Sequence, residues 1–219
     1  MYQSHQALLG EEIWAALKSL APERNRETRS LLLRQGDPAT HIHLLCHGAV
    51  AVTRRDGSGQ RTLLTVRGAG ELLGELSLLD GGVRSATVIA TEPCRVHTVP
   101  AAEFTSFVSD HGLLHTLMRH TVGRIRESEE IRQELATAPA SARLAAALLR
   151  LAAVSGESPT GSVHIQLPQE EIAQLIGASR NSVVQHLSPW RAEGWIRSVT
   201  GGGLVIEDLG RLRQIAERR

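Results

Sequence analysis

One short stretch of the chain, GELSLLDGGVRSA at residues 74–86, combines groups that bind phosphorylated ligands. Glu75 offers a carboxylate that accepts hydrogen bonds from hydroxyl groups, while Arg84 and Ser85 offer a guanidinium and a hydroxyl that donate to an anion. If these side chains converge, they form a pocket for a small ligand that carries both hydroxyls and an anionic phosphate. The alternative is that Glu75 and Arg84 pair only with each other.

The composition of the whole chain is that of a globular protein, with 219 residues, 42% hydrophobic and 21% charged. The net charge of +1 does not indicate nucleic-acid binding, so any DNA site must be a local surface. Glu11 and Glu12 are inconsistent with a signal peptide, and no apolar run reaches membrane-spanning length, so we expect a cytoplasmic protein with no membrane partner. Cys46 and Cys94 lie in apolar runs and are expected to be buried, reduced thiols.

Secondary-structure signals divide the chain into a β-rich part and helical parts. A short helix is predicted at residues 13–20 and is ended by Pro22. From Arg29 to Val99 short β-rich runs alternate with turns, of which Asp56–Gly59 is a strong hairpin turn, and this pattern predicts a β-roll or β-barrel. From Asp110 to Ala136 no proline interrupts the helical character, which predicts one long helix.

A seam of residues spaced four and three apart runs along this predicted helix, as in a two-stranded coiled coil. Its members are Leu114, Met118, Thr121, Ile125, Ser128, Arg132 and Leu135. The spacing predicts a homodimer, although the polar members leave the seam incompletely apolar. The alternative is a core helix in which the heptad spacing is accidental.

The segment QEEIAQLIGASRNSVVQHLSPWRAEGWI has the pattern of a helix-turn-helix. Pro168 opens the first helix, Gly177 permits the sharp turn and Ser179 caps the second helix. The apolar positions fall at the offsets that such a pair of helices needs: Ile172, Leu175, Ile176, Val183, Leu187 and Trp190. Residues 195–199 and 204–206 flank the glycines of a predicted hairpin, Gly201–Gly203, so the whole segment predicts a winged helix.

The second of these helices presents the side chains expected to contact DNA: Ser179, Arg180, Asn181 and Gln185. Arginine pairs with guanine O6 and N7, and asparagine and glutamine pair with adenine N6 and N7. The alternative for this face is an ordinary solvated helix surface.

Together, the β-roll with GELSLLDGGVRSA, the heptad helix and the QEEIAQLIGASRNSV winged helix resemble the cyclic AMP receptor protein family, the Crp/Fnr regulators, over essentially the whole chain. The resemblance implies an α+β fold with three parts. Residues 1–109 would be a cyclic-nucleotide-binding effector domain, residues 110–138 a dimerisation helix, and residues 139–219 a winged helix-turn-helix DNA-binding domain.

In this family the phosphate-binding cassette reads G-E-[LI]-x and, several residues later, R-[ST]-A. The resemblance implies that Glu75 binds the ribose 2′-hydroxyl, that Arg84 and Ser85 bind the cyclic phosphate, and that Ser128 meets the adenine at the dimer seam. The implied ligand-binding residues are Gly74, Glu75, Leu76, Ser77, Arg84, Ser85 and Ser128. Glu129 stands where a second serine is expected, so cyclic AMP is the first candidate effector but the base is left open.

The resemblance also implies a homodimer on a palindromic operator in double-stranded DNA. Asn181 and Gln185 replace the family's glutamate and second arginine, which predicts an altered operator half-site rich in adenine contacts. The loop Ser155–Ser162 lies where relatives touch RNA polymerase, a further candidate partner. The alternative is an orphan regulator that binds DNA without a cyclic nucleotide, or one that answers to a different ligand.

Metal, haem and catalytic chemistry are not expected. His111 and His115 are one turn apart, and His41 and His43 share one strand face, but scattered surface histidines are more common than metal or haem ligands. Two cysteines cannot complete a four-cysteine iron–sulfur site. The sequence contains no GxSxG elbow, P-loop or HExxH motif, so we do not expect an enzyme.

Overall fold

A computed structural model describes residues 3–155, 162–199 and 203–217 of the chain. The chain divides into two compact units, Met1–Glu129 and Glu130–Arg219, which are described separately. The RNA-polymerase loop predicted at Ser155–Ser162 and the hairpin glycines Gly201 and Gly202 fall largely or wholly outside the described residues. None of the helices in the described ranges is both long and apolar enough to cross a membrane.

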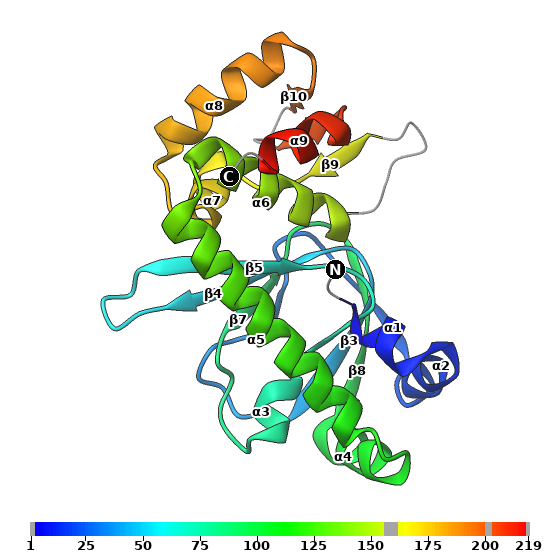
Figure 1. Ribbon diagram of the computed structural model, residues 1–219. Coiled ribbons are helices and arrows are strands. Elements are labelled where there is room, and N and C mark those ends of the chain that lie inside the picture. Colours follow the sequence, from blue (N-terminus) through cyan, green and yellow to red (C-terminus); the bar gives the residue numbers. More distant parts are fainter. Residues whose placement is uncertain (1–2, 156–161, 200–202, 218–219) are drawn as a thin grey trace. The chain divides into compact units, whose positions relative to one another are not determined.

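The first unit is a β-roll with helices before and after it (Figure 1). Its strands form two antiparallel four-stranded sheets, in the orders β1-β8-β3-β6 and β2-β7-β4-β5. The elements are α1 (His5–Leu9), α2 (Glu11–Ser19), β1 (Glu23–Arg26), β2 (Leu31–Leu33), β3 (His41–His47), β4 (Val50–Arg55), β5 (Arg61–Arg67), β6 (Glu71–Leu73), α3 (Glu75–Leu79), β7 (Thr87–Ala90), β8 (Cys94–Pro100), α4 (Ala101–Asp110) and α5 (Leu114–Thr137). The predicted β-roll is confirmed.

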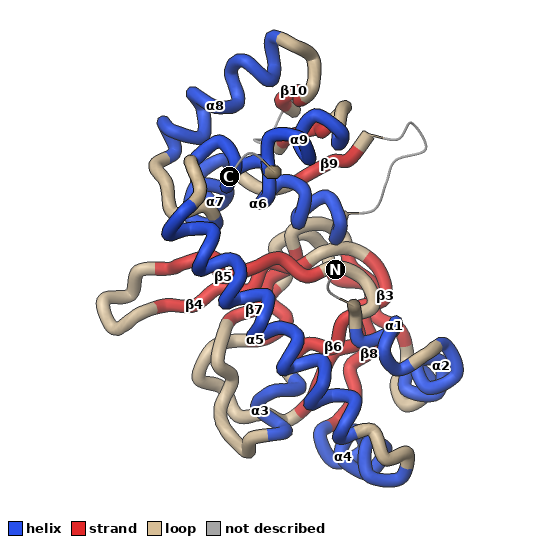
Figure 2. Tube along the Cα trace, viewed as in Figure 1, coloured by secondary structure: helices blue, strands red, loops and turns tan. Residues whose placement is uncertain are grey.

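Strand β3 is buried on both faces over Ile42–Leu45, and three of these four residues are apolar. Successive side chains of a strand point to opposite faces. Leu44 therefore joins an apolar cluster with Trp14 and Phe104 from the flanking helices, whereas Leu45 joins a second cluster with Val88 and other residues of the strands. The roll is thus held by one core between its sheets and another beneath its helices. Figure 2 distinguishes the strands of the roll from the helices that flank them.

The hairpin turn at Asp56–Gly59 is confirmed between β4 and β5. The Asp56 carboxylate accepts hydrogen bonds from the backbone N–H groups of Ser58 and Gln60 and from the Ser58 hydroxyl. Gly59 has a φ of +83°, a conformation that favours glycine. Both cysteines are free thiols, Cys94 buried and Cys46 half-buried.

The helix prediction from Asp110 is wrong at its start. Helix α4 ends at Asp110, and α5 begins only at Leu114. Between them Gly112 takes a φ of +61°, a left-handed conformation that ends a helix, and the prediction overlooked this glycine. The predicted N-terminal helix is found as α2, but α1 and β1 were not predicted.

The second unit contains the helix-turn-helix. The part of α5 beyond Glu129 is followed by α6 (Ala140–Val154), β9 (Val163–Ile165), α7 (Gln169–Leu175), α8 (Arg180–Ala192), β10 (Ile196–Ser198), β11 (Leu204–Ile206) and α9 (Leu209–Ala216). The strands pair antiparallel in the order β10-β11-β9, with Ser198 opposite Leu204 at the wing. Arg150 on α6 forms a two-pronged ion pair with Glu134 on α5, at 2.9 and 3.1 Å.

A buried histidine in the roll predicts a pH-dependent stability. Both ring nitrogens of His43 are hydrogen-bonded, Nδ1 with Thr98 Oγ1 and Nε2 with Leu32 O, and burial lowers the pKa of His43 to about 4. Between pH 6.5 and 4 the unfolded chain therefore binds a proton at this site that the folded chain does not. We expect His43 to account for a loss of about 3 kcal/mol in the free energy of unfolding as the pH falls through this window.

The measurement is urea unfolding at several pH values between 7 and 4. His43→Gln should lose less stability than the wild type across this range, because its side chain does not titrate. His47→Gln, which changes an exposed histidine on the same strand, should retain the wild-type pH dependence. An equal loss in the wild type and in His43→Gln would contradict the prediction.

Candidate ligand-binding site and DNA-recognition helix

The cassette begins where β6 passes into α3. Gly74 lies between them with a φ of +92°, the left-handed conformation. A Cβ atom at this position would lie 2.6 Å from Arg84 Nη1 and 2.9 Å from Leu33 Cδ1. Only glycine allows the backbone to turn this closely around the Arg84 guanidinium.

Arg84 is buried and points into the roll, with 3% of its surface exposed. Its Nη1 donates to Gly74 O at 2.6 Å and to Ser77 Oγ at 2.9 Å, and its Nη2 donates to His41 O at a short distance. Burial lowers the pKa of Arg84, while nearby Glu75 and Asp37 raise it. The structure thus brings Gly74, Ser77 and Arg84 together as the sequence predicted.

Glu75 is the first residue of α3 and is also buried, with 3% of its surface exposed. Its Oε1 lies 3.8 Å from Arg124 Nη1 on α5 and 4.0 Å from His5 Nε2 on α1. The predicted pairing partner, Arg84, interacts electrostatically with Glu75, but no ion pair within 4.0 Å joins these two side chains among the described residues. Arg124 was not singled out in the sequence, although it lies one helical turn before Ser128.

Three of the predicted ligand-binding residues are exposed. Leu76 and Ser85 lie at the surface of the cassette. Ser128 is exposed on α5, and its hydroxyl donates to Arg124 O at 2.9 Å. Within the single chain the structure therefore brings the cassette together with Arg124 rather than with Ser128.

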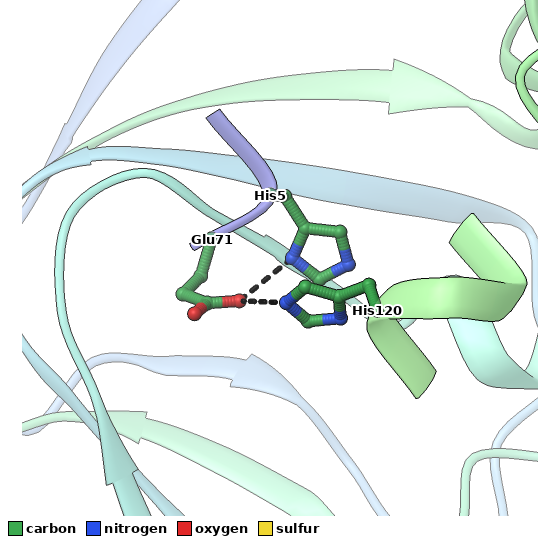
Figure 3. A group of neighbouring side chains, drawn as sticks. All are labelled: His5, Glu71 and His120. Carbon is green, nitrogen blue, oxygen red and sulfur yellow. Dashed lines mark hydrogen bonds and ion pairs between the residues drawn. The ribbon is translucent and has the colours of Figure 1, made fainter. Parts of the chain in front are cut away.

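A cluster that the sequence analysis missed lies beside Glu75 (Figure 3). It consists of His5 on α1, Glu71 on β6 and His120 on α5, all buried. His5 Nδ1 is 2.7 Å and His120 Nε2 is 3.5 Å from Glu71 Oε2, and the two imidazole rings stack with centroids 3.4 Å apart. The spacing of His120 and Arg124, four residues apart on one helix face, was the available signal.

Burial and the contacts within this cluster shift the pKa values of Glu71 and His120. Burial raises the pKa of Glu71, but contact with His120 and His5 outweighs burial and holds that pKa at about 2. Burial lowers the pKa of His120, against the contact with Glu71, which raises it. The cluster therefore favours an ionised carboxylate.

Three of the four histidines considered in the sequence, His41, His43 and His111, have hydrogen bonds or ring contacts in the fold. His43 is hydrogen-bonded through both nitrogens, and His41 Nδ1 lies 3.0 Å from Thr40 Oγ1. His111 stacks on Phe107 and bonds Phe107 O through Nδ1. In the described ranges, the groups of three or more potential ligands are His5, Glu71 and His120, and Glu23, Cys46 and His97.

In the second unit, α7 and α8 form the helix-turn-helix. Gly177 makes the turn with a φ of +59°, and Ser179 caps α8 by accepting a hydrogen bond from Ser182 N at 3.1 Å. The apolar positions of the motif are buried: Ile172, Ala173, Ile176, Val183, Leu187 and Trp190. This packing leaves the predicted DNA-contacting residues exposed on the cap and first turns of α8: Ser179, Arg180, Asn181 and Gln185.

Comparison with known proteins gives a family match within each unit. Residues 23–111 match the family described as cyclic nucleotide-binding domain, and residues 142–215 match the Crp-like helix-turn-helix domain. The chain is 31% identical over 185 residues to the CRP-like cAMP-activated global transcriptional regulator of Mycobacterium tuberculosis, covering 83% of this chain and 82% of the relative. It is 32% identical over 183 residues to the cyclic AMP receptor protein of Thermus thermophilus, with coverage of 83% and 82%.

A solved structure gives the same result. A transcriptional regulator of the CRP/FNR family from Thermus thermophilus superposes with a TM-score of 0.72 at 26% identity, covering 90% of this chain and 100% of the other. The fold and the two sites define a DNA-binding transcription regulator with a cyclic nucleotide-binding domain. The chain belongs to the Crp/Fnr family of transcription regulators.

The geometry of Gly74 generates a prediction about stability. We expect Gly74→Ala to lower the free energy of unfolding by at least about 1 kcal/mol, because alanine is strained at positive φ and its Cβ would displace the Arg84 guanidinium. Urea unfolding measures the change. Gly57→Ala is the matched control, since no atom lies within 4 Å of a Cβ at Gly57. Equal stability of the two variants would contradict the assigned role of Gly74.

Proposed function

We propose that this Crp/Fnr regulator binds cyclic AMP in its first unit and, as a homodimer, binds a palindromic DNA operator. The observation that carries the proposal is that two charged residues, Glu75 at the start of α3 and Arg84 in the loop after it, are buried within the segment that matches the cyclic nucleotide-binding domain. The Mycobacterium tuberculosis relative is named as cAMP-activated, which makes cyclic AMP the first ligand to test.

Each polar group of the cassette has a role in this proposal. Glu75 accepts the hydrogen bond of the ribose 2′-hydroxyl, and Arg84 and Ser85 donate to the cyclic phosphate. Arg84 uses three of its five N–H donors on protein acceptors in the described ranges, so two stay available for an anion. The exposed hydroxyl of Ser128 on α5 meets the adenine at the dimer seam.

The dimer interface in this proposal is the exposed apolar stripe of α5. Leu114, Met118, Val122 and Ile125 are 44–57% exposed in the single chain, whereas Leu117 on the opposite face is buried. A contiguous apolar surface of this kind is typical of a protein interface. A second copy of the same helix covers it with the heptad packing expected from the sequence.

A second candidate function differs only in the pocket. The protein would bind DNA without a cyclic nucleotide, or would bind a different ligand. Two observations favour it: Arg124 already lies beside Glu75, where the ribose would bind, and the acidic Glu129 follows Ser128. A ligand for this pocket must displace or recruit Arg124.

The test is a titration of the purified protein with cyclic AMP, cyclic GMP and cyclic di-GMP while fluorescence anisotropy follows binding to an operator selected from random DNA. We expect cyclic AMP to increase DNA affinity. Arg84→Ala should weaken cyclic AMP binding at least about tenfold, because the variant loses a charge-assisted hydrogen bond to the phosphate. It should also abolish the increase in DNA affinity that cyclic AMP causes. Arg54→Ala, which changes an exposed arginine on β4, should leave both unchanged.

Two outcomes would count against the proposal. Unchanged cyclic AMP affinity of Arg84→Ala in calorimetry would contradict the assigned pocket. Specific DNA binding that no cyclic nucleotide alters would support the second function.

The dimer has its own test. Ile125→Glu should raise the dimer dissociation constant about 100-fold or more, because an unpaired charge buried at an interface costs at least about 3 kcal/mol. Analytical ultracentrifugation measures the constant. Val83→Glu is the matched control, since Val83 is a similarly exposed apolar residue of the roll that is not part of α5. If the two variants dissociate alike, α5 is not the interface.

A further inference from the structure

Three potential metal ligands meet in the first unit from distant parts of the sequence. His5 comes from α1, Glu71 from β6 and His120 from α5 (Figure 3). At most 5% of each side chain is exposed, and one ligand atom from each lies within 4.8 Å of the others. The cyclic-nucleotide pocket proposed above does not use any of these side chains.

His5 Nδ1 has two neighbours that compete for it. The backbone N–H of Leu72, 3.2 Å away, can donate to this nitrogen only when the nitrogen carries a lone pair, whereas a hydrogen bond to Glu71 Oε2, 2.7 Å away, requires a proton on it. One tautomer therefore cannot make both contacts. A metal ion between Nδ1 and Oε2 would accept a lone pair from each of these atoms, and His120 Nε2 lies 3.5 Å from the same oxygen.

From this geometry we propose that His5, Glu71 and His120 bind a divalent first-row transition metal ion. Two imidazoles and one carboxylate are ligands of zinc, iron, cobalt and nickel, whereas magnesium and calcium prefer oxygen ligands in larger number. Metal bonds of about 2.0–2.2 Å in a tetrahedral site place ligand atoms about 3.4 Å apart. The observed separations of 2.7 and 3.5 Å from Glu71 Oε2 therefore need only a small shift of the His5 ring.

The surroundings supply the further parts that metal sites need. When His5 Nδ1 binds the ion, its Nε2–H faces Glu75 Oε1, 4.0 Å away, as a carboxylate that orients the ring. Three protein ligands leave one coordination position open for water or another small ligand. The segment that carries His5 is also held to the roll, because the backbone N–H of Gln6 donates to Gly70 O at 2.9 Å.

The other potential group, Glu23, Cys46 and His97, has a weaker case. Its members are half-buried or exposed, and His97 Nδ1 lies 2.6 Å from Ala21 O, which engages one of its ring nitrogens. Burial also raises the pKa of the Cys46 thiol, which disfavours the thiolate that a metal binds. This group serves as an internal control.

The experiment uses the untagged, full-length protein after EDTA treatment, titrated with Zn²⁺ in calorimetry and with Co²⁺ in absorption spectroscopy. We expect one ion per chain and a cobalt spectrum of nitrogen and oxygen ligands without a sulfur charge-transfer band. His120→Ala, His5→Ala and Glu71→Gln should each weaken Zn²⁺ binding at least about 100-fold. His115→Ala, an exposed position on α5, and His97→Ala should bind as the wild type does.

The result does not depend on the cyclic nucleotide, because binding is measured with the metal alone. Urea unfolding and circular dichroism establish which variants remain folded, and His5→Ala keeps the test decisive if a substitution at β6 or α5 prevents folding. Absence of Zn²⁺ binding, binding unchanged in the folded cluster variants, or a sulfur charge-transfer band lost in His97→Ala would overturn the proposal. In the first two cases the cluster is a hydrogen-bonded network only.

Discussion

The buried guanidinium of Arg84 is the interaction on which the first unit depends. Its side chain joins the end of β6, the start of α3 and the start of β3 through Gly74 O, Ser77 Oγ and His41 O. Its backbone adds a second link, because Arg84 N donates to Asp37 O and Gly36 N donates to Arg84 O. A buried cation is tolerated when polar groups surround it, so these three acceptors must stay in place.

The position of Arg84 suits both a structural role and the ligand-binding role proposed for it. The same bonds that hold the loop around α3 fix the direction of the guanidinium before any ligand arrives. A preorganised donor loses little entropy on binding an anion. In the proposed function, the phosphate then binds the Arg84 guanidinium, which folding has already removed from water.

Helix α5 has one buried face and one exposed face. Leu117 and His120 are buried against the roll, while Met118 and Ile125 are exposed. Between these faces lies Arg124, 20% exposed at its side chain and 3.8 Å from Glu75. In the proposed mechanism a ligand at Glu75 changes the partner of Arg124, and this provides the differential contact that a shift between two conformations requires.

Local patterns predicted the features that local chemistry determines. The turn at Asp56–Gly59, the glycine at position 74 and the capped helix α8 all follow from a few neighbouring residues. Strand β1 was missed because its sequence, ERNR, lacks apolar alternation, and it forms only through pairing with β8 at the sheet edge. The His5–Glu71 contact joins residues 66 positions apart, so no local sequence pattern can predict it.

Glu71 and Glu75 lie on either side of Gly74 in the sequence, and their carboxylates have different neighbours in the fold. Glu71 faces the two imidazoles of His5 and His120, nitrogen ligands that together with a carboxylate suit a transition metal. Glu75 faces the guanidinium of Arg124, 3.8 Å away, and the charge of Arg84, and its carboxylate oxygens can accept a hydroxyl hydrogen bond. In the sequence both are acids near one turn. Because their partners come from α1 and α5, the packing of these helices on β6 and α3 is what separates the metal role proposed for one acid from the ribose role proposed for the other.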